Sequence, residues 1–227
     1  MLTLAFDSSN QALSLALMED QQVLGEILLT IKKNHSINLM PSIDYLLVSC
    51  DKEAKELDRI VVAKGPGSYT GIRMAVATAK TLAYALNIEL VGRSSLEALL
   101  VQEGQGLQIP LVNARRNHVY AGIYQDGKLV REDAYQSIDG LLEEAARYAS
   151  PLFVGEVEAF EGLIKETVPE ARIQASYPSA AQLILLGQEA EAENIHAFEP
   201  AYLKRVEAEE NWLKDHKETG DSYIKRV

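Results

Sequence analysis

The sequence is poor in cysteine and in long apolar runs, and each shortage excludes a class of protein. Cys50 is the only cysteine among 227 residues, so no disulfide can form within the chain, which fits a reducing compartment. No uninterrupted apolar run approaches the roughly 20 residues that a membrane-spanning helix needs. The N-terminus also lacks the basic and apolar pattern of a secretory signal. We therefore expect a cytoplasmic protein without membrane contact.

A surplus of positive charge is missing as well. The chain has 33 acidic residues against 22 lysines and arginines, which gives a formal net charge of −11. Proteins that bind nucleic acid by themselves usually present a basic surface to the phosphates. We therefore expect any polyanion to reach this chain through a partner.

Histidines are few, and no two of them have the spacing that places a metal-binding pair on one helix. They stand at positions 35, 118, 196 and 216, and the residue that would complete a pair with His35 is Leu39. Composition alone leaves a Ser/His/Asp triad open, but Ser68 lies in Pro-Gly-Ser-Tyr-Thr rather than in a Gly-x-Ser-x-Gly elbow. We therefore expect no bound metal and no catalytic residue.

The most informative stretch that is present is residues 61–86, where an apolar run ends in a loop with three glycines and a helical pattern follows at once. Thr70 is the predicted N-cap of a helix over 70–86. The loop is no Walker A loop, because Ile72-Arg73 follow its last glycine, and it is one residue too long for the dinucleotide fingerprint. Two interpretations stay open, a nucleotide-binding loop and a tight turn into a packed helix, and the second is favoured.

The predicted helix 70–86 has an apolar face built largely of alanine. Its apolar residues recur at helical spacing, at Ile72, Ala75, Val76, Ala79, Leu82, Ala83 and Leu86. Small side chains let another helix or a sheet approach closely. This face therefore suits either a partner helix or internal packing, and the sequence leaves the choice open.

The predicted elements follow a similar order in the two halves of the chain. The first half has strands at 2–9, 12–18, 22–29, 59–64 and 88–91, and helices at 35–50 and 70–86, with a further helix of about ten residues beginning at Ser94, where Glu97 completes a capping box. The second half has strands at 108–113, 118–125, 128–134 and 152–155, and helices at 137–149, 157–167 and 178–192; Asp126-Gly127 is a hairpin signal.

Gly104-Gln105-Gly106 is the clearest domain boundary in the sequence. We therefore predict an N-terminal lobe at 1–103, a C-terminal lobe at 104–206 and a charged tail at 207–227.

Two polar motifs lie at predicted strand ends. Asp7-Ser8-Ser9 could hold a metal-bound water or face a phosphate, or it could cap the next turn. Arg115-Arg116 could bind phosphate or form a solvated pair. The residues alone leave both choices open.

Several motifs together resemble one family. The stretch Lys64–Arg73 with its alanine-rich helix, taken with Asp7-Ser8-Ser9, resembles the bacterial TsaB (YeaZ) family of tRNA threonylcarbamoyladenosine biosynthesis. His35-Ser36 with Leu39-Met40-Pro41 is similar to that family's first helix. Residues 113–121 are similar to its Asp-Ala-Arg-Arg motif, with Asn113 where aspartate is frequent, and residues 200–204 to its Pro-x-Tyr-Leu-Arg segment.

The resemblance implies an α/β fold of two ribonuclease H-like lobes of the actin/Hsp70/hexokinase-like (ASKHA) type, each with a mixed five-stranded sheet flanked by helices. It implies a non-catalytic scaffold that binds and activates TsaD, together with the ATPase TsaE. The complex would transfer threonylcarbamoyl to adenosine 37 of tRNAs that read ANN codons, and this chain would meet tRNA only through the complex. The resemblance also implies a homodimer when TsaD is absent. No cofactor is expected to bind tightly, and ATP or ADP is expected at most at the partner interface.

The implied partner or dimer surface lies on helices 36–49 and 70–86 and comprises His35, Ser36, Leu39, Met40, Ile43, Leu47, Thr70, Arg73, Met74, Ala77, Thr78 and Thr81. The residues that would shape the loop or contact a nucleotide are Asp7, Ser8, Ser9, Lys64, Gly65, Gly67, Ser68, Tyr69, Gly71, Asn113, Arg115 and Arg116. A nucleotide-dependent phosphotransferase of the sugar-kinase type is the alternative function, in which Asp7 and the glycine loop would place Mg-ATP. A glycoprotease is disfavoured by the missing histidine pair and the missing nucleophile elbow.

Overall fold

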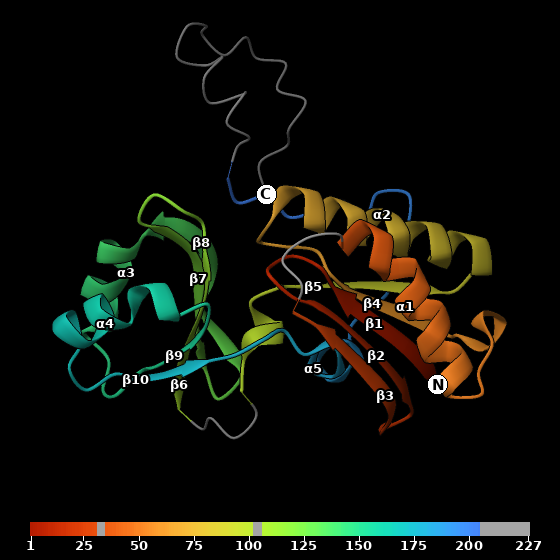
Figure 1. The fold of residues 1–227 in the computed structure, drawn as a ribbon, viewed down its shortest axis with the longest axis horizontal. Coiled ribbons are helices and arrows are strands. Elements are labelled where there is room, and N and C mark those ends of the chain that lie inside the picture. Colours follow the sequence, from red (N-terminus) through yellow and green to blue (C-terminus); the bar gives the residue numbers. More distant parts are fainter. Residues whose placement is uncertain (31–34, 102–105, 205–227) are drawn as a thin grey trace, which may run out of the picture.

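The computed structural model describes residues 1–30, 35–101 and 106–204, and two five-stranded sheets lie side by side in it as two lobes (Figure 1). The strand order is β3-β2-β1-β4-β5 in the first sheet and β8-β7-β6-β9-β10 in the second. In each sheet the first three strands are antiparallel, and the last two run parallel to the first. The predicted fold of two ribonuclease H-like lobes of the ASKHA type is thereby confirmed.

The elements follow the predicted order closely. The first lobe contains β1 (Leu2–Asp7), β2 (Leu13–Glu19), β3 (Gln22–Leu29), α1 (His35–Ser49), β4 (Arg59–Ala63), α2 (Tyr69–Leu86) and β5 (Glu89–Arg93). The second contains β6 (Leu107–Asn113), β7 (His118–Gln125), β8 (Lys128–Ser137), α3 (Ile138–Ala145), β9 (Leu152–Gly155), α4 (Glu161–Thr167) and β10 (Arg172–Ala175), and α5 (Ala180–Gly187) follows. Short 3-10 turns lie at η1 (Ala54–Glu56), η2 (Glu97–Leu99) and η3 (Glu158–Phe160).

The first sheet is covered on both faces, which explains why β1 is an unbroken buried run. Leu4 and Phe6 belong to the core beneath α1 and α2, whereas Ala5 between them belongs to the core beneath α5. Ala16 and Ala63 continue this second face. Because these side chains are small, α5 can pack close to the strands.

The C-terminal part of the described chain returns to the first lobe, although the prediction placed all of residues 104–206 in the C-terminal lobe. α5 packs against the strands of the first sheet (Figure 1). The buried guanidinium of Arg59 donates from Nη1 to the carbonyl oxygens of Gly187 and Gln188 at 2.6 and 2.9 Å. The apolar face of α5 would suit either sheet, so the sequence alone could not assign it. The predicted tail lies outside the described residues.

Three local predictions are wrong, and one strand was missed. Ser94 begins no ten-residue helix, because its Oγ donates to the Asp133 carboxylate in β8 and only η2 follows. Thr70 is not the N-cap of α2, since the Ser68 Oγ accepts from the Gly71 N–H and the helix begins at Tyr69. The predicted helix 178–192 ends at Gly187. The missed strand is β10, which is short and mostly exposed.

Pro41 lies inside α1 without ending it. The Asp126-Gly127 hairpin is confirmed, with φ values of 51° and 76°. Among the residues that the structure describes, none of the helices has the length and apolar character that crossing a membrane requires.

Candidate functional site

The glycine loop lies directly on the turn that follows β1. A Cβ atom at Gly67 would lie 2.3 Å from the carbonyl oxygen of Ser9, and one at Gly71 would lie 2.1 Å from that of Ser8. Hydrogen bonds join the same segments, from the Ser68 N–H to the Ser9 oxygen at 2.6 Å and from the Ser8 Oγ to the Gly71 oxygen at 2.9 Å. These glycines therefore let two backbones approach each other, and one face of the loop is closed by the chain itself.

The third glycine meets another part of the chain. Gly65 has φ 117°, and a Cβ there would lie 2.4 Å from the carbonyl oxygen of Ala201. The N–H of Ala201 donates to the Lys64 oxygen at 2.7 Å. The side chain of Lys64 points toward the same C-terminal segment, since its Nζ pairs with Glu193 at 2.9 Å and lies 5.5 Å from the ring centre of Phe198. The loop thus anchors the C-terminal segment that returns to the first lobe.

Asp7 ends β1 in a fully buried position. Its Oδ1 accepts from the Ser9 N–H at 2.6 Å. Neither its Oδ2 nor the Oγ of Ser9 has a hydrogen-bond partner among the described residues. Burial raises the pKa of the Asp7 carboxyl to about 6, although the hydrogen bond from the Ser9 N–H opposes the shift. The carboxyl therefore caps the next turn, and one of its oxygens is left unsatisfied.

The second lobe places a carboxylate beside Asn113, where the family often has aspartate. The N–H of Asn113 donates to the Glu156 Oε2 at 3.0 Å, and its Oδ1 accepts from the Arg115 N–H at 2.9 Å. Burial raises the pKa of Glu156, while bonds from Asn113 and Gln11 oppose the shift. Glu156 follows β9, and Gln11 belongs to the first lobe, so this carboxylate lies where the two lobes meet. The sequence prediction missed Glu156, because no motif marks it.

Three consecutive residues after Asn113 have left-handed backbone. The φ values of Arg115, Arg116 and Asn117 are 66°, 52° and 57°. Arginine rarely adopts this conformation, which is typical of glycine and asparagine. Both arginine side chains are exposed at this strained turn.

The structure divides the predicted partner surface into a buried and an exposed part. Leu39, Ile43 and Leu47 lie in the core of the first lobe, so these three side chains cannot meet a partner without unfolding. His35 is half-buried, with its Nε2 3.2 Å from the Asn10 oxygen, and Met74 and Thr78 are half-buried too. The exposed members are Ser36, Met40, Thr70, Arg73, Ala77 and Thr81.

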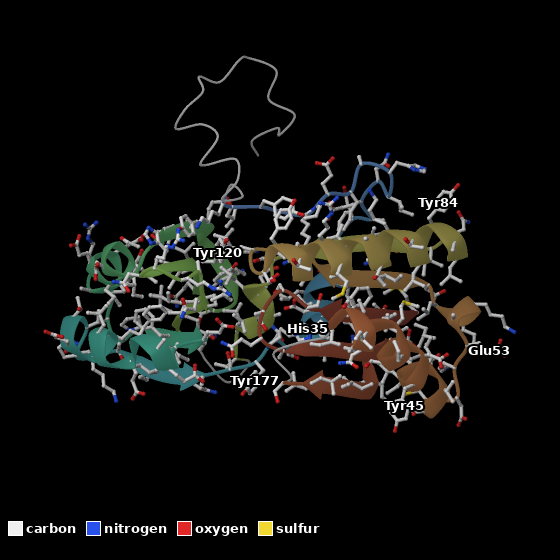
Figure 2. All side chains as sticks on the ribbon, turned by 45° about the horizontal axis from the view of Figure 1, so that its top comes forward. His35, Tyr45, Glu53, Tyr84, Tyr120 and Tyr177 are labelled. Atoms are coloured by element: carbon white, nitrogen blue, oxygen red, sulfur yellow. The ribbon has the colours of Figure 1, made fainter. Side chains whose placement is uncertain are left out.

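The exposed face of α1 also carries apolar side chains, of which only Met40 belongs to the predicted partner surface. Ile37, Tyr45 and Val48 are 67%, 67% and 66% exposed, and Met40 is 48% exposed. Figure 2 shows Tyr45 at the outer edge of the first lobe and Tyr84, also exposed, near the far end of α2. The signal that could have found Ile37 and Val48 is their spacing, since both fall on the side of the helix opposite Ile43.

The alanine face of α2 points inward. Ile72, Ala75, Val76, Ala79 and Ala83 are all buried against the first sheet. The close approach that the small side chains allow is therefore used for internal packing. A partner that contacts α2 could reach only the opposite face of this helix.

The comparisons with known proteins agree with this architecture. A family model described as TsaD, tRNA N6-adenosine threonylcarbamoyltransferase, matches residues 22–212. The tRNA threonylcarbamoyladenosine biosynthesis protein TsaB of Bacillus subtilis (strain 168) is 38% identical over 229 residues, which covers 96% of this chain and 100% of that protein. The chain belongs to the TsaB family. Through the model match it also belongs to the wider family that the TsaD model describes.

Solved structures of the TsaB (YeaZ) family share the fold. The structure titled YeaZ from Pseudomonas aeruginosa has a TM-score of 0.74 and 26% identity, and the match covers 89% of this chain and 99% of that one. A tRNA N6-adenosine threonylcarbamoyltransferase of Desulfovibrio desulfuricans is 32% identical over 141 residues, or 53% of this chain and 39% of that protein. This chain is thus a homologue of a protein of tRNA threonylcarbamoyladenosine biosynthesis. Within its described part, no three His, Cys, Asp or Glu side chains gather closely enough to hold a metal ion.

Proposed function

We propose that this chain is a non-catalytic subunit that binds and activates TsaD and works with the ATPase TsaE. The complex would transfer threonylcarbamoyl to adenosine 37 of tRNAs that read ANN codons. Family membership supports the pathway, and the exposed apolar face of α1 supports the role as a binding subunit. We place TsaD on the exposed faces of α1 and α2.

The observation that carries this proposal is the row of apolar side chains on α1. Ile37, Met40 and Val48 lie on one side of the helix and are 67%, 48% and 66% exposed. Apolar side chains that gather on one exposed face favour a protein interface. The exposed residues Ala77 and Thr81 lie on one ridge of the neighbouring α2, so a partner could contact both helices.

Co-purification with TsaD tests the proposal. Val48→Asp should weaken the complex, because it replaces an exposed apolar side chain at the C-terminal end of this face with a charge. Val130→Asp in β8 is the matched control, since Val130 is 54% exposed in the other lobe and should tolerate the change. Both variants should melt close to the wild type. Equal binding of TsaD by both variants would exclude α1 as the interface.

The same surface can serve self-association. Without TsaD the chain should form a homodimer through α1 and α2, and added TsaD should dissociate this homodimer. Sedimentation of the wild type and of Val48→Asp measures this directly. A Val48→Asp protein that remains dimeric would place the dimer contact elsewhere.

Catalysis is tested with the isolated chain. We expect no transfer of threonylcarbamoyl to tRNA without TsaD, and we expect ATP or ADP to bind only once the partner interface has formed. Transfer by the chain alone would make it a transferase like the relative from Desulfovibrio. Tight magnesium-dependent ATP binding with hydrolysis by the chain alone would favour the sugar-kinase-like alternative.

A further inference from the structure

Two exposed tyrosines and two cations lie where the lobes meet, and a third cation, Arg115, belongs to a turn that is joined to them through His118 and Tyr135. They come from three distant segments of the chain. We define this basic-aromatic surface by Tyr69 and Arg73 at the start of α2, Arg115 in the turn between β6 and β7, and Tyr202 and Lys204 at the end of the described chain. In Figure 1 the blue segment that ends at residue 204 runs between the beginning of α2 and the top of β8. The surface therefore spans both lobes.

On the first lobe the aromatic part is held by direct contacts. The rings of Tyr69 and Tyr202 stack with their centres 4.7 Å apart and their planes 23° apart. The Nη1 of Arg73 donates to the Tyr69 hydroxyl at 3.3 Å. Tyr69 and Tyr202 are still 43% and 39% exposed, so ring surface remains open to solvent.

On the second lobe a stack of rings positions the lysine. The Nζ of Lys204 lies 4.9 Å from the ring centre of Tyr135, and His118 stacks on the same ring at 4.9 Å. The Nδ1 of His118 lies 2.8 Å from the carbonyl oxygen of Arg116, which joins this stack to the left-handed turn. Lys204 and the turn are thus parts of one connected arrangement.

The left-handed turn is an energetically unfavourable backbone conformation for an arginine. Arg115 has φ 66° and is the first of three successive non-glycine residues with left-handed backbone. Such conformations persist only where the surrounding structure enforces them, and they gather at functional sites. Glycine or asparagine would adopt the same turn with less strain, so the arginine side chain is the feature that needs explaining.

Cations interleaved with exposed aromatic rings are the usual means of binding an RNA strand. Arginine and lysine contact phosphates, and unpaired bases stack on aromatic side chains. An acidic protein surface would use the cations but would leave the rings without a role. We propose that the basic-aromatic surface contacts the phosphate backbone and an unpaired base of the substrate tRNA when the chain is assembled with TsaD. This inference rests on the proposed function.

The overall charge of −11 fits a secondary role for this surface. Three cations on an acidic protein release few counterions, so the isolated chain should bind tRNA weakly. Within a complex the same contacts become intramolecular and add to those of the partner. The expectation that a polyanion reaches this chain through a partner is therefore retained.

The test measures binding of fluorescently labelled, unmodified tRNA to the reconstituted complex with TsaD at several salt concentrations. The variant is the double substitution Arg115→Asn with Lys204→Gln, which removes two charges and keeps the turn. Arg147→Asn is the control, because Arg147 is exposed just beyond the end of α3 in the second lobe and is no member of this surface. The double variant should bind tRNA about tenfold more weakly, the combined loss expected for two phosphate contacts of modest strength.

The salt dependence identifies the kind of interaction. The slope of log affinity against log salt should fall by about 0.7 for each phosphate that the variant no longer binds. Tyr202→Leu should weaken binding without changing this slope, because stacking releases no counterions. The control variant should match the wild type in both affinity and slope, and all variants should melt within a few degrees of it.

Three outcomes would overturn the inference, and assembly is scored separately by size-exclusion chromatography. Normal tRNA affinity of an assembled double variant would refute the RNA contact alone. Loss of TsaD binding by the double variant would make the surface a protein interface instead. Failure of the wild type to assemble with TsaD would refute the proposed function, and the inference would fall with it.

Discussion

The N–H of Ala201 donates a 2.7 Å hydrogen bond to the carbonyl oxygen of Lys64, and this bond places the end of the described chain on the glycine loop. The loop therefore contacts two other segments of its own chain, the turn after β1 and the returning C-terminal segment. A loop of this composition is expected to leave its backbone N–H groups available for phosphate. Here its glycines serve backbone packing.

Replacing a loop glycine should therefore destabilise the fold. Gly71→Ala, inside α2, would place a Cβ 2.1 Å from the Ser8 oxygen. We expect a loss of about 1–3 kcal/mol in the free energy of unfolding, as for other overpacked sites. Gly162→Ala, inside α4, is the matched control, since nothing lies within 4 Å of its Cβ position. That change should stabilise by about 0.5–1 kcal/mol through helix propensity. Urea unfolding measures the change in the free energy of unfolding for both variants. Equal changes would contradict this role of Gly71.

Asp7→Asn should make the stability of the protein less dependent on pH. The folded state raises the pKa of Asp7 from 3.8 to about 6, so it favours the neutral carboxyl. This contribution is fully present below pH 4 and is lost as the pH rises through 6, at a cost of about 3 kcal/mol. The asparagine keeps the oxygen that accepts from Ser9 and carries no charge. Denaturation at pH 4 and at pH 7.5 should show stabilisation only at the higher pH, and equal destabilisation at both would indicate that Asp7 has a charged partner.

The sequence was sufficient for the parts of the fold that depend on local pattern. The pattern of residues 2–9 correctly indicated the strand β1, and Asp126-Gly127 correctly marked the hairpin between β7 and β8. The Ser94 helix failed because a tertiary contact decided the outcome. The Ser94 hydroxyl donates to Asp133 in the other lobe. Of the predicted capping box, only the hydrogen bond from the Ser94 N–H to the Glu97 carboxylate forms.

The candidate site was less accessible to sequence reasoning, because burial decides which face of a helix is available. Leu39 and Ile37 are both apolar and both lie on α1, yet the first is 1% exposed and the second 67%. Only the position of α1 over β2 and β3 separates them. The return of α5 to the first sheet also depends on the whole chain, since it requires Arg59 and the small residues of β1 and β2 at once.

Arg59 forms an ion pair with Glu89, with 2.5 Å between Nη2 and Oε2. Arg59 should nevertheless contribute far more to the stability of the fold than Glu89 does. Arg59 is 8% exposed, and its Nη1 satisfies the carbonyl oxygens of Gly187 and Gln188 at the end of α5. Arg59→Met would leave these acceptors and the carboxylate unpaired, at a cost of about 2–4 kcal/mol. Glu89 has a side chain that is 51% exposed, so Glu89→Gln should cost less than about 1 kcal/mol. Thermal and urea unfolding of both variants give the comparison, and similar losses would mean that the ion pair, rather than the helix end, holds Arg59.

Two alanines two residues apart on α2 should respond in opposite ways to the same substitution. Ala79 is fully buried against the first sheet, whereas Ala77 is exposed on the ridge that we assign to TsaD. Ala79→Arg should abolish folding, because a guanidinium cannot be buried there without a partner. Ala77→Arg should leave the melting temperature close to that of the wild type and weaken co-purification with TsaD, because a long side chain would separate the helices. A folded Ala79→Arg protein would contradict the inward packing of this face, and undiminished binding by Ala77→Arg would move the interface away from α2.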